Sequence, residues 1–239
     1  MQENHKRDRV VVGLNLALPL ALAACELGHL DMPLARLFGG PAGFALREHW
    51  MLAEVLHGGG RVLSWTLALG LCLGVWWPFG WLRRLALSQR LQLAVGTLAA
   101  VITVSLVKNH NGTSCPWDLT DFGGLIPPAS HWLGFLTPDG GSGRCFPAGH
   151  ASAGFAFVAG YFAFRHADPV LARRWLAAAL LAGFVLGMGQ QLRGAHFMSH
   201  TLWSAALCWW AALALDALWR PLQRLQQGLS PYQGNPRLP

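Results

Sequence analysis

The sequence predicts an all-α membrane protein with six transmembrane helices. Of its 239 residues, 53% are hydrophobic and 12% are charged, and this charged fraction is about half that of an average soluble domain. Apolar runs of about 17 to 25 residues are long enough to cross a bilayer core. Six such runs occur in the chain: Val10–Cys25, Val62–Trp81, Leu91–Val107, Pro147–Phe164, Trp175–Leu192 and Phe197–Trp219.

The placement of the basic residues predicts how these spans are oriented. Twelve of the eighteen Lys and Arg residues lie in the two tails, between the second and third spans, or between the fourth and fifth. Because cytoplasmic segments are enriched in Lys and Arg, we expect both termini in the cytoplasm. The net charge of +7 therefore reflects topology and does not predict nucleic-acid binding.

One transmembrane domain accounts for most of the chain. Residues 1–9 are expected to be a cytoplasmic tail, residues 10–220 the domain, and residues 221–239 a second polar cytoplasmic tail. The first apolar run is not followed by a small-residue cleavage site, so we interpret it as a retained helix and not as a signal peptide.

The chain between the first two spans is expected on the outer side. Glu26–Gly43 is expected to be a loop, and Phe44–Leu56 mixes apolar with charged residues. That mixture is typical of a short amphipathic helix in the membrane interface, here periplasmic. This helix would either plug the bundle or gate the access of lipids, and Gly58–Gly60 would end it. Further on, Gly154 and Gly183 predict close packing of the fourth and fifth spans.

Ionisable residues from three outer segments are predicted to meet in one layer. Lys108 ends the third span, His150 lies in the first turn of the fourth, and Arg193 and His196 lie between the fifth and sixth. Eight of the ten histidines lie in or beside outer segments. Lys108 alone would be interpreted as a snorkelling anchor, but ionisable groups gathered at membrane depth are expected to be functional.

The residue types in this layer, drawn from residues 108–150 and 190–200, suit a bound phosphate. Cations and imidazoles with few acids match phosphoryl transfer, in which catalysis is largely positioning and charge neutralisation. Backbone N–H groups in the first turn of a helix lack intrahelical partners and carry the positive end of the helix dipole. Gly149 and His150 are therefore also placed to bind an anion.

The cysteines and the paired histidines raise two further questions. Cys115 and Cys145 bracket the long outer loop, and we expect a disulfide between them in an oxidising compartment, the alternative being two free thiols. His196 and His200 are four residues apart, a spacing that can bind zinc. Because no Glu follows the first His and no third ligand is evident, no metal or other cofactor is expected. The remaining cysteines lie in apolar spans and are expected to be packing residues: Cys25, Cys72 and Cys208.

At these residues the chain resembles the type 2 phosphatidic acid phosphatase (PAP2) superfamily of integral membrane lipid phosphatases. The family's motifs are Lys with Arg-Pro seven and eight residues later, then Pro-Ser-Gly-His, then Arg with His six residues later followed by an acid. The chain matches Lys108 with Pro116, then Pro147–His150, then Gly194–His196. The resemblance covers almost the whole chain and implies the family's six-helix bundle.

Four positions depart from the motifs, as in a variant subfamily. Cys115, Ala148 and Gln190 stand where the family has Arg, Ser and Arg, and His200 stands where it has an acid. Arg193, three residues before the motif histidine, is expected to supply a missing positive charge.

The resemblance implies a covalent mechanism. His196 would attack phosphorus to give a phosphohistidine, while Lys108, Arg193 and the N–H groups of Gly149 and His150 hold the phosphate oxygens. His150 would protonate the leaving group. An attacking imidazole needs its other nitrogen held by a partner, and we expect that partner to be Asp118, with His200 as the second candidate.

The function expected is therefore hydrolysis of a lipid phosphate at the periplasmic face of a bacterial inner membrane. The candidate substrates are undecaprenyl pyrophosphate, phosphatidylglycerol phosphate, phosphatidic acid and the phosphates of lipid A. The partners expected are this substrate and membrane lipids, and the sequence leaves the oligomeric state open. Two alternatives remain open, namely transfer of the phosphoryl group to a lipid or sugar acceptor and a non-catalytic lipid-binding protein.

Overall fold

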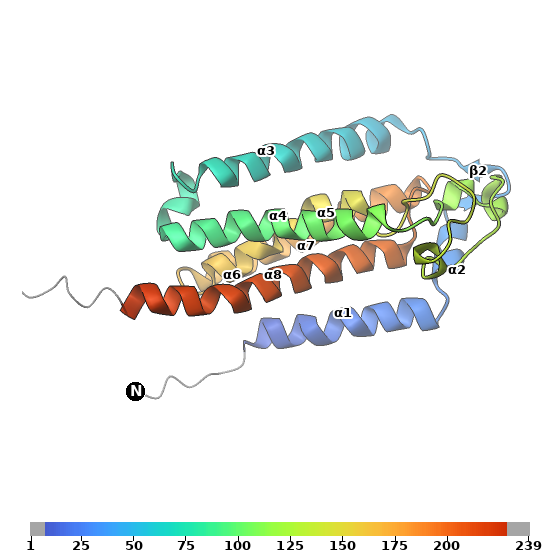
Figure 1. Cartoon of the computed structure of the whole chain (residues 1–239). Helices are drawn as coiled ribbons and strands as arrows, with labels where there is room; N and C mark the ends of the chain where they lie inside the picture. The colour runs from blue at the N-terminus through green and yellow to red at the C-terminus, as the bar shows by residue number, and fades with distance from the viewer. Residues whose placement is uncertain (1–7, 229–239) are drawn as a thin grey trace, which may run out of the picture.

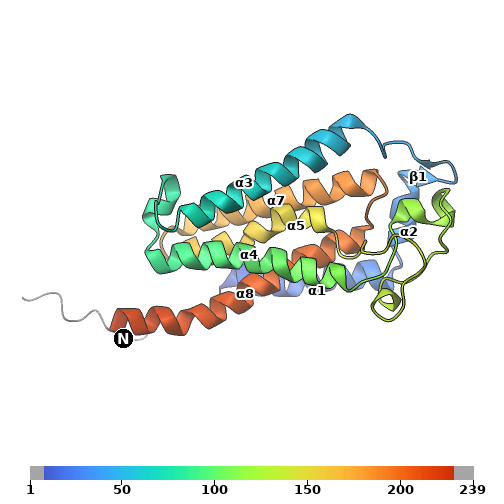
Figure 2. The same ribbon diagram turned by 45° about the horizontal axis from the view of Figure 1, so that its top comes forward.

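The chain folds into helical rods that lie side by side, with an irregular cap at one end (Figures 1 and 2). The computed structural model describes residues 8–228, with side chains described up to residue 221. Most of the two predicted cytoplasmic tails, residues 1–7 and 229–239, lies outside the described residues. The helices and strands are α1 (Arg9–Leu27), α2 (Asp31–Arg36), β1 (Gly39–Gly40), β2 (Gly43–Phe44), η1 (Met51–Gly59), α3 (Gly60–Leu73), η2 (Gly80–Arg84), α4 (Leu87–Asn109), η3 (Pro116–Asp118), η4 (Thr120–Phe122), η5 (Leu133–Phe135), α5 (Gly149–Phe155), η6 (Ala156–Val158), α6 (Ala159–Phe164), α7 (Pro169–Leu192) and α8 (Met198–Gly228).

The predicted helical class is confirmed, and four of the predicted spans are long helices. Within residues 8–228, the helices long and apolar enough to cross a membrane are α1, α4, α7 and the Met198–Pro221 part of α8. The other two predicted spans are not single long helices. The second, Val62–Trp81, is helical in α3 as far as Leu73, and turn residues then lead into η2 at Gly80. The fourth joins α5 to α6 through the 3₁₀ turn η6. Six membrane crossings therefore stay a prediction.

Two of the long helices begin at a capping aspartate. Asp8 accepts a hydrogen bond from the backbone N–H of Val10 at 3.1 Å, and Asp168 accepts one from that of Leu171 at 2.9 Å. A side-chain oxygen at this position satisfies a backbone donor that has no partner within the helix. Pro169 follows as the first residue of α7, where its missing N–H costs nothing. These caps fix where α1 and α7 begin at the same end of the bundle.

The outer chain before α3 differs from the prediction. The expected loop Glu26–Gly43 contains the last residues of α1, the short helix α2 and a tight antiparallel hairpin of β1 with β2. The interfacial helix predicted over Phe44–Leu56 is not a separate element, because Phe44 lies in β2 and helical structure starts at Met51.

The glycine run was expected to end that helix, but the chain stays helical through it. Helix packing explains this, because Leu56 of η1 lies directly over Gly189 of α7, and Leu186 of α7 lies 2.7 Å from where a Cβ of Gly60 would be. Contact with α7 thus overrides the low helix propensity of glycine.

The predicted close packing of the fourth and fifth spans is confirmed. A Cβ built on Gly154 of α5 would collide with the backbone nitrogen of Gly183 in α7, and one on Gly183 would collide with the ring of Phe155. Small residues let two helix backbones approach closely. This contact fixes the start of α5, and therefore His150, relative to the end of α7.

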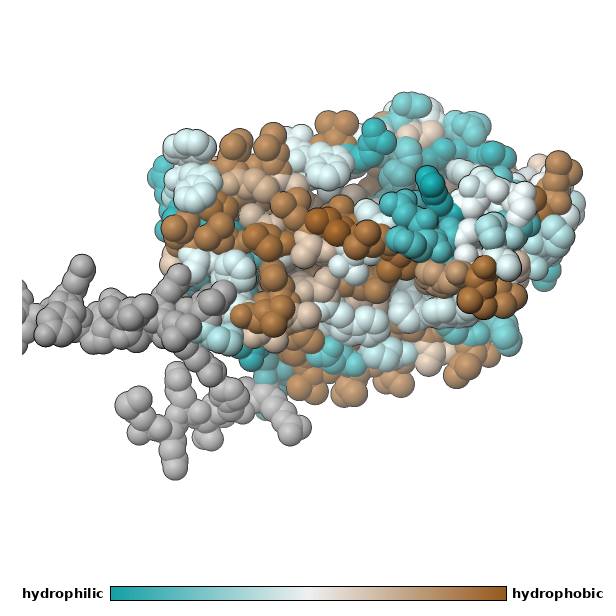
Figure 3. Space-filling model, in the orientation of Figure 1, coloured by the Kyte–Doolittle hydropathy of each residue, from teal (hydrophilic) through white to brown (hydrophobic). Residues whose placement is uncertain are grey.

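The two ends of the bundle differ in character. The start of α1 and the C-terminal part of α8 lie at one end of the bundle, and α2, the hairpin and the long loop lie at the other (Figure 1). Apolar side chains cover much of the flank between them (Figure 3), and Val62, Leu63 and Leu181 are each more than half exposed. An apolar flank of this kind is expected to face lipid.

Candidate active site

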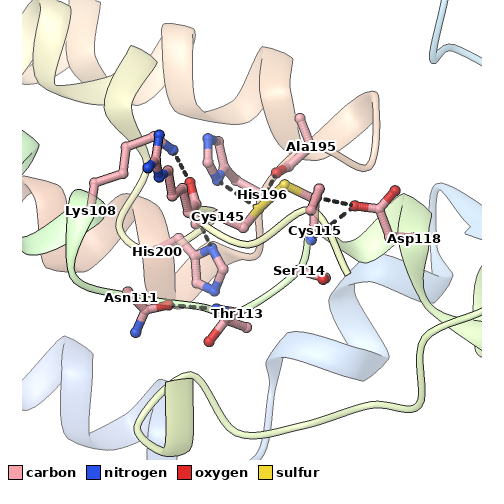
Figure 4. Close-up of a disulfide and its surroundings, with 12 residues drawn as sticks. Lys108, Asn111, Thr113, Ser114, Cys115, Asp118, Cys145, Ala195, His196 and His200 are labelled. Carbon is pink, nitrogen blue, oxygen red and sulfur yellow. Dashed lines mark hydrogen bonds between the residues drawn. A yellow bond between two sulfur atoms is a disulfide. The ribbon is translucent and has the colours of Figure 1, made fainter. Parts of the chain in front are cut away.

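The long outer loop is tied together at its two ends. The predicted disulfide between Cys115 and Cys145 is present, with Cα atoms 5.1 Å apart. Beside it, the N–H of Arg144 donates to the carbonyl of Asn111 and the N–H of Cys145 donates to that of Thr113, both at 2.9 Å. Figure 4 shows how this brings the end of α4 next to the α7–α8 turn. The chain segments that carry the predicted site residues therefore meet.

Lys108 lies at the end of α4 and faces the first turn of α5. Its side-chain carbons lie 3.5 to 3.6 Å from where a Cβ of Gly149 would be. Its ammonium donates to the carbonyl of Arg144. It also lies close enough to His150 and His196 to interact with both electrostatically. The predicted convergence of a lysine and two histidines is thus present.

Backbone contacts with α8 fix the start of α5. Ala148, fully buried, provides no side-chain cap for the helix. Its N–H donates to the carbonyl of His200 at 3.2 Å, and the hydroxyl of Ser204 donates to its carbonyl at 2.9 Å. The position where the family has a serine is therefore held through its backbone.

His150 has a neighbour that the sequence analysis missed. The ring of His57, from η1, lies on the ring of His150 with centroids 3.8 Å apart. The Nε2 atom of His150 is buried and has no hydrogen-bond partner. The only signal for His57 in the sequence was its place among the outer histidines, because a contact between η1 and α5 depends on tertiary packing.

His196 lies in the turn between α7 and α8, and Gly194 makes this turn possible. Gly194 has a positive φ of 77°, and a Cβ there would collide with the ring of Phe44. His196 is 5% exposed, and its Nδ1 lies 3.5 Å from Sγ of Cys145. Nδ1 of this ring therefore faces the disulfide, and Nε2 does not.

The electrostatic surroundings of His196 favour its neutral form. Burial holds the pKa of His196 well below its usual value of 6.5, and the nearby Lys108, His200 and His150 act in the same direction. Removing a group from water disfavours its charged form, and neighbouring cations add to that effect. A neutral imidazole is the form that can act as a nucleophile.

His200 is fully buried in α8 beside His196. Its ring meets that of His196 edge-on, with centroids 5.7 Å apart. Its Nδ1–H donates to the carbonyl of Cys145 at 3.1 Å, while its Nε2 is buried without a partner. Behind it, the ring of His131 lies 5.6 Å away, and His131 Nε2 lies 3.1 Å from a carboxylate oxygen of Glu26. The sequence analysis missed both Glu26 and His131, because they come from separate segments without a motif.

Arg193 is buried at the end of α7 and turns toward the outer cap. Its Nε donates to the carbonyl of Arg47 at 2.8 Å, and one terminal nitrogen lies 3.4 Å from the side-chain oxygen of Gln190. Its guanidinium lies 5.9 Å from the ring centre of Trp117. It still interacts electrostatically with His150. The predicted arginine therefore contributes charge at the edge of the layer.

Asp118 does not contact His196. Its carboxylate accepts hydrogen bonds from the N–H of Cys115 at 3.3 Å and from the hydroxyl of Ser142 at 2.9 Å. Figure 4 places it beyond the disulfide from His196. Because the 3₁₀ turn η3 folds Asp118 back on Cys115, its carboxylate stabilises the disulfide loop, and the direct contact predicted for it is not formed.

Among the described residues, one group of side chains has the composition of a metal site. The ligand atoms of Cys145, His196 and His200 all lie within 4.8 Å of one another. The sulfur of Cys145 is bonded to Cys115, however, so it cannot act as the thiolate ligand that a zinc site made of Cys and His requires. The oxidised chain therefore lacks a thiolate ligand at this cluster.

An apolar groove of about 1120 Å³ begins beside the site and runs between η1–α3 and α5–α7. Leu56 and Gly59, which line it, flank His57, and Ala153 lies one turn beyond His150. At its far end the groove is lined by Trp81, Arg84 and Arg174. The groove therefore has sequence neighbours of both His57 and His150 in its lining at one end and reaches toward the opposite end of the bundle at the other.

Fold and site together define a helical membrane protein with a layer of cations and imidazoles at one end of its bundle. The family model of the PAP2 superfamily matches residues 89–223. This is more than half of the chain, and the chain belongs to the PAP2 superfamily. The matched region includes every predicted site residue, and the family consists in general of phosphatases and related phosphotransferases. No curated protein and no solved structure matches the chain significantly.

Proposed function

We propose that this chain is a membrane phosphatase that hydrolyses a lipid phosphomonoester or pyrophosphate through a phosphohistidine on His196. The observation that carries the proposal is the gathering of Lys108, His150 and His196 at the start of α5, with Arg193 at the edge. Positive charge around a neutral imidazole is the arrangement that in-line phosphoryl transfer requires.

Each residue has a role in this mechanism. Nε2 of His196 attacks phosphorus, and the P–N bond forms as the bond to the leaving oxygen breaks. Lys108, Arg193 and the N–H groups of Gly149 and His150 hold the other oxygens. His150 protonates the leaving oxygen and then takes a proton from the water that cleaves the P–N bond, releasing phosphate.

His200 is the residue that we propose to orient His196. It occupies the position of the family's usual acid and contacts the nucleophile's ring directly. Its own orientation is fixed by the hydrogen bond to the carbonyl of Cys145. Asp118, which contacts the loop instead, supports the site through the disulfide.

The groove supports a lipid as the substrate. A hydrocarbon chain in the groove would be removed from water, while its phosphate reached His150 at the near end. We further propose that this end of the bundle faces the periplasm of a bacterial inner membrane, because the basic connections lie at the other end.

Phosphate release by purified protein tests the function. The substrates are a prenyl diphosphate, phosphatidic acid, phosphatidylglycerol phosphate and lipid A, and the variants are His196→Ala and, as a control, His49→Gln, an exposed histidine of the cap. We expect release from at least one substrate, a loss of about 10⁴-fold or more in His196→Ala, and little change in the control. Equal release by wild type and His196→Ala, or release by neither, would contradict the proposal.

The same assay separates hydrolysis from transfer. With an excess of a lipid alcohol present, a phosphatase is expected to release inorganic phosphate as before. Formation of the phosphorylated alcohol at the expense of inorganic phosphate would identify a phosphotransferase.

A further inference from the structure

Two residues outside the family-matched region lie beside the layer of cations and imidazoles. His57 lies in η1, and Arg61 lies four residues later in α3, so the two share a face of one continuous helical rod. The ring of His57 contacts that of His150 at a tilt of 31°, and the guanidinium of Arg61 interacts electrostatically with both imidazoles. The carboxylate of Glu54, three residues before His57, also interacts with His57 and favours its charged form.

The π-helical form of η1 accounts for the direction of His57. A π-helix shifts the register of side chains relative to an α-helix, and such segments are frequent at functional sites. In η1, Leu56 packs on Gly189 of α7 while the next residue, His57, meets His150 of α5. The rod thus presents an apolar side chain to the bundle and an imidazole to the reaction centre.

These residues become more exposed from the nucleophile outward. His196 is buried, His150 and His57 are half-buried, and Arg61 is exposed. The groove starts at the neighbours of His57 and His150. A lipid chain in this groove would therefore bring its head group to the end of the groove that lies beside His57 and His150.

We infer that His57 and Arg61 form a second phosphate subsite, which binds the lipid-linked phosphate of a diphosphate lipid while the terminal phosphate lies at His196. This inference rests on the proposed function and narrows its substrate class to lipid diphosphates. Arg61 supplies positive charge beyond what one phosphate needs, and His57 offers a ring N–H beside it; charge-assisted hydrogen bonds to phosphate are among the stronger ones. A lipid monophosphate at His196 would leave these two residues without an anion.

The reaction on such a substrate is balanced. The P–N bond to His196 forms on the terminal phosphorus as its bond to the bridging oxygen breaks, and the electron pair stays on that oxygen. His150 gives the oxygen its proton, and the lipid monophosphate leaves. Water then cleaves the P–N bond and gives a proton to His150, so that the products are orthophosphate, neutral His196 and reprotonated His150.

Kinetics with a matched substrate pair tests the subsite. The probes are a prenyl diphosphate and the prenyl monophosphate of the same chain length. The variants are His57→Gln and Arg61→Gln, with His49→Gln on the cap and Arg83→Gln at the far end as exposed controls. We expect each subsite variant to lower kcat/KM for the diphosphate about tenfold and that for the monophosphate less than about twofold. Equal losses on both probes, or no loss on the diphosphate, would overturn the inference.

Binding provides a measurement that does not depend on turnover. The probes are a prenyl methylenediphosphonate and the matching monophosphonate, which cannot be hydrolysed. Arg61→Gln is expected to raise Kd about tenfold for the diphosphonate only, and equal shifts for both would overturn the inference. If wild type releases phosphate from neither prenyl substrate, the proposed function fails on these lipids, while the binding comparison still decides the subsite.

Discussion

His196 combines the burial and the charge that phosphoryl transfer requires. The turn at Gly194 places it between the disulfide and His200, away from bulk water. The lysine that would hold the phosphate also favours the neutral form of this imidazole. In the proposed mechanism, binding of the phosphate and activation of His196 are therefore two effects of one charge arrangement.

The pH dependence of turnover tests this point. Because burial and neighbouring cations lower the pKa of His196 below 6.5, its protonation should occur only at lower pH. We expect kcat/KM to stay constant as the pH falls through 6.5 and to decline only well below it. The measurement is the pH profile of kcat/KM. Binding of a phosphonate analogue of the substrate, followed over the same pH range, serves as the control for ionisation of the substrate. A decline centred at or above 6.5 that follows the protonation of His196 by NMR would contradict this account.

Among the connecting elements, the disulfide couples the folding of the outer loop to the site. It closes a loop with a sequence separation of 30, and its Cys145 sulfur lies 3.5 Å from Nδ1 of His196. The same loop is tied to the α7–α8 turn by the N–H of Trp117, which donates to the carbonyl of Gly194 at 2.9 Å. Loss of the bond would free both the loop and one side of His196.

Removal of the disulfide should lower stability and activity together. We expect Cys115→Ser with Cys145→Ser to lose about 3 kcal/mol in the free energy of unfolding and to lower kcat by more than it raises KM. Unfolding in detergent with and without a dithiol reductant provides the measurement. Reduced wild type should behave like the double variant, and unchanged stability in both would refute the role given to the bond.

At the level of elements, the sequence predicted the long helices well and the outer cap poorly. The length of the apolar runs predicted α1, α4, α7 and α8, because a helix that crosses a bilayer needs an apolar run of that length. The hairpin and the helical run through Gly58–Gly60 depend on contacts with distant residues, which local composition does not report.

For the site, the spacing of the family's motifs predicted the residues that match those motifs. Lys108, His150 and His196 were found in this way, and the disulfide followed from the position of two cysteines. Asp118 was assigned from proximity in sequence, yet a local turn directs it to Cys115. His57 was missed, because only the packing of η1 on α5 brings it to the site.

For the whole molecule, the two ends of the bundle have different roles. The end with the disulfide loop carries the site, and the opposite end carries ion pairs that tie its helices together, such as Arg165 with Asp216 at 2.8 Å and Arg84 with Asp168 at 2.5 Å. The apolar groove extends from one end toward the other. We propose that the site and the basic connections lie on opposite sides of the membrane.

Cysteine labelling tests that orientation. Leu136, 80% exposed in the outer loop, and Arg83, exposed between α3 and α4, are replaced singly by cysteine. A membrane-impermeant maleimide applied to spheroplasts should label Leu136→Cys and not Arg83→Cys, with wild type as the background. The reverse pattern would contradict the proposed topology.

The most direct test of the central claim is to trap the phosphorylated enzyme. Wild type is mixed with a lipid phosphate labelled in its phosphoryl group, quenched in alkali to preserve phosphohistidine, and digested for mass spectrometry. The account predicts a phosphoryl group on the imidazole of His196, lost in His196→Ala and retained in the His49→Gln control. Phosphate release without any label on His196, or with the label on another residue, would contradict it.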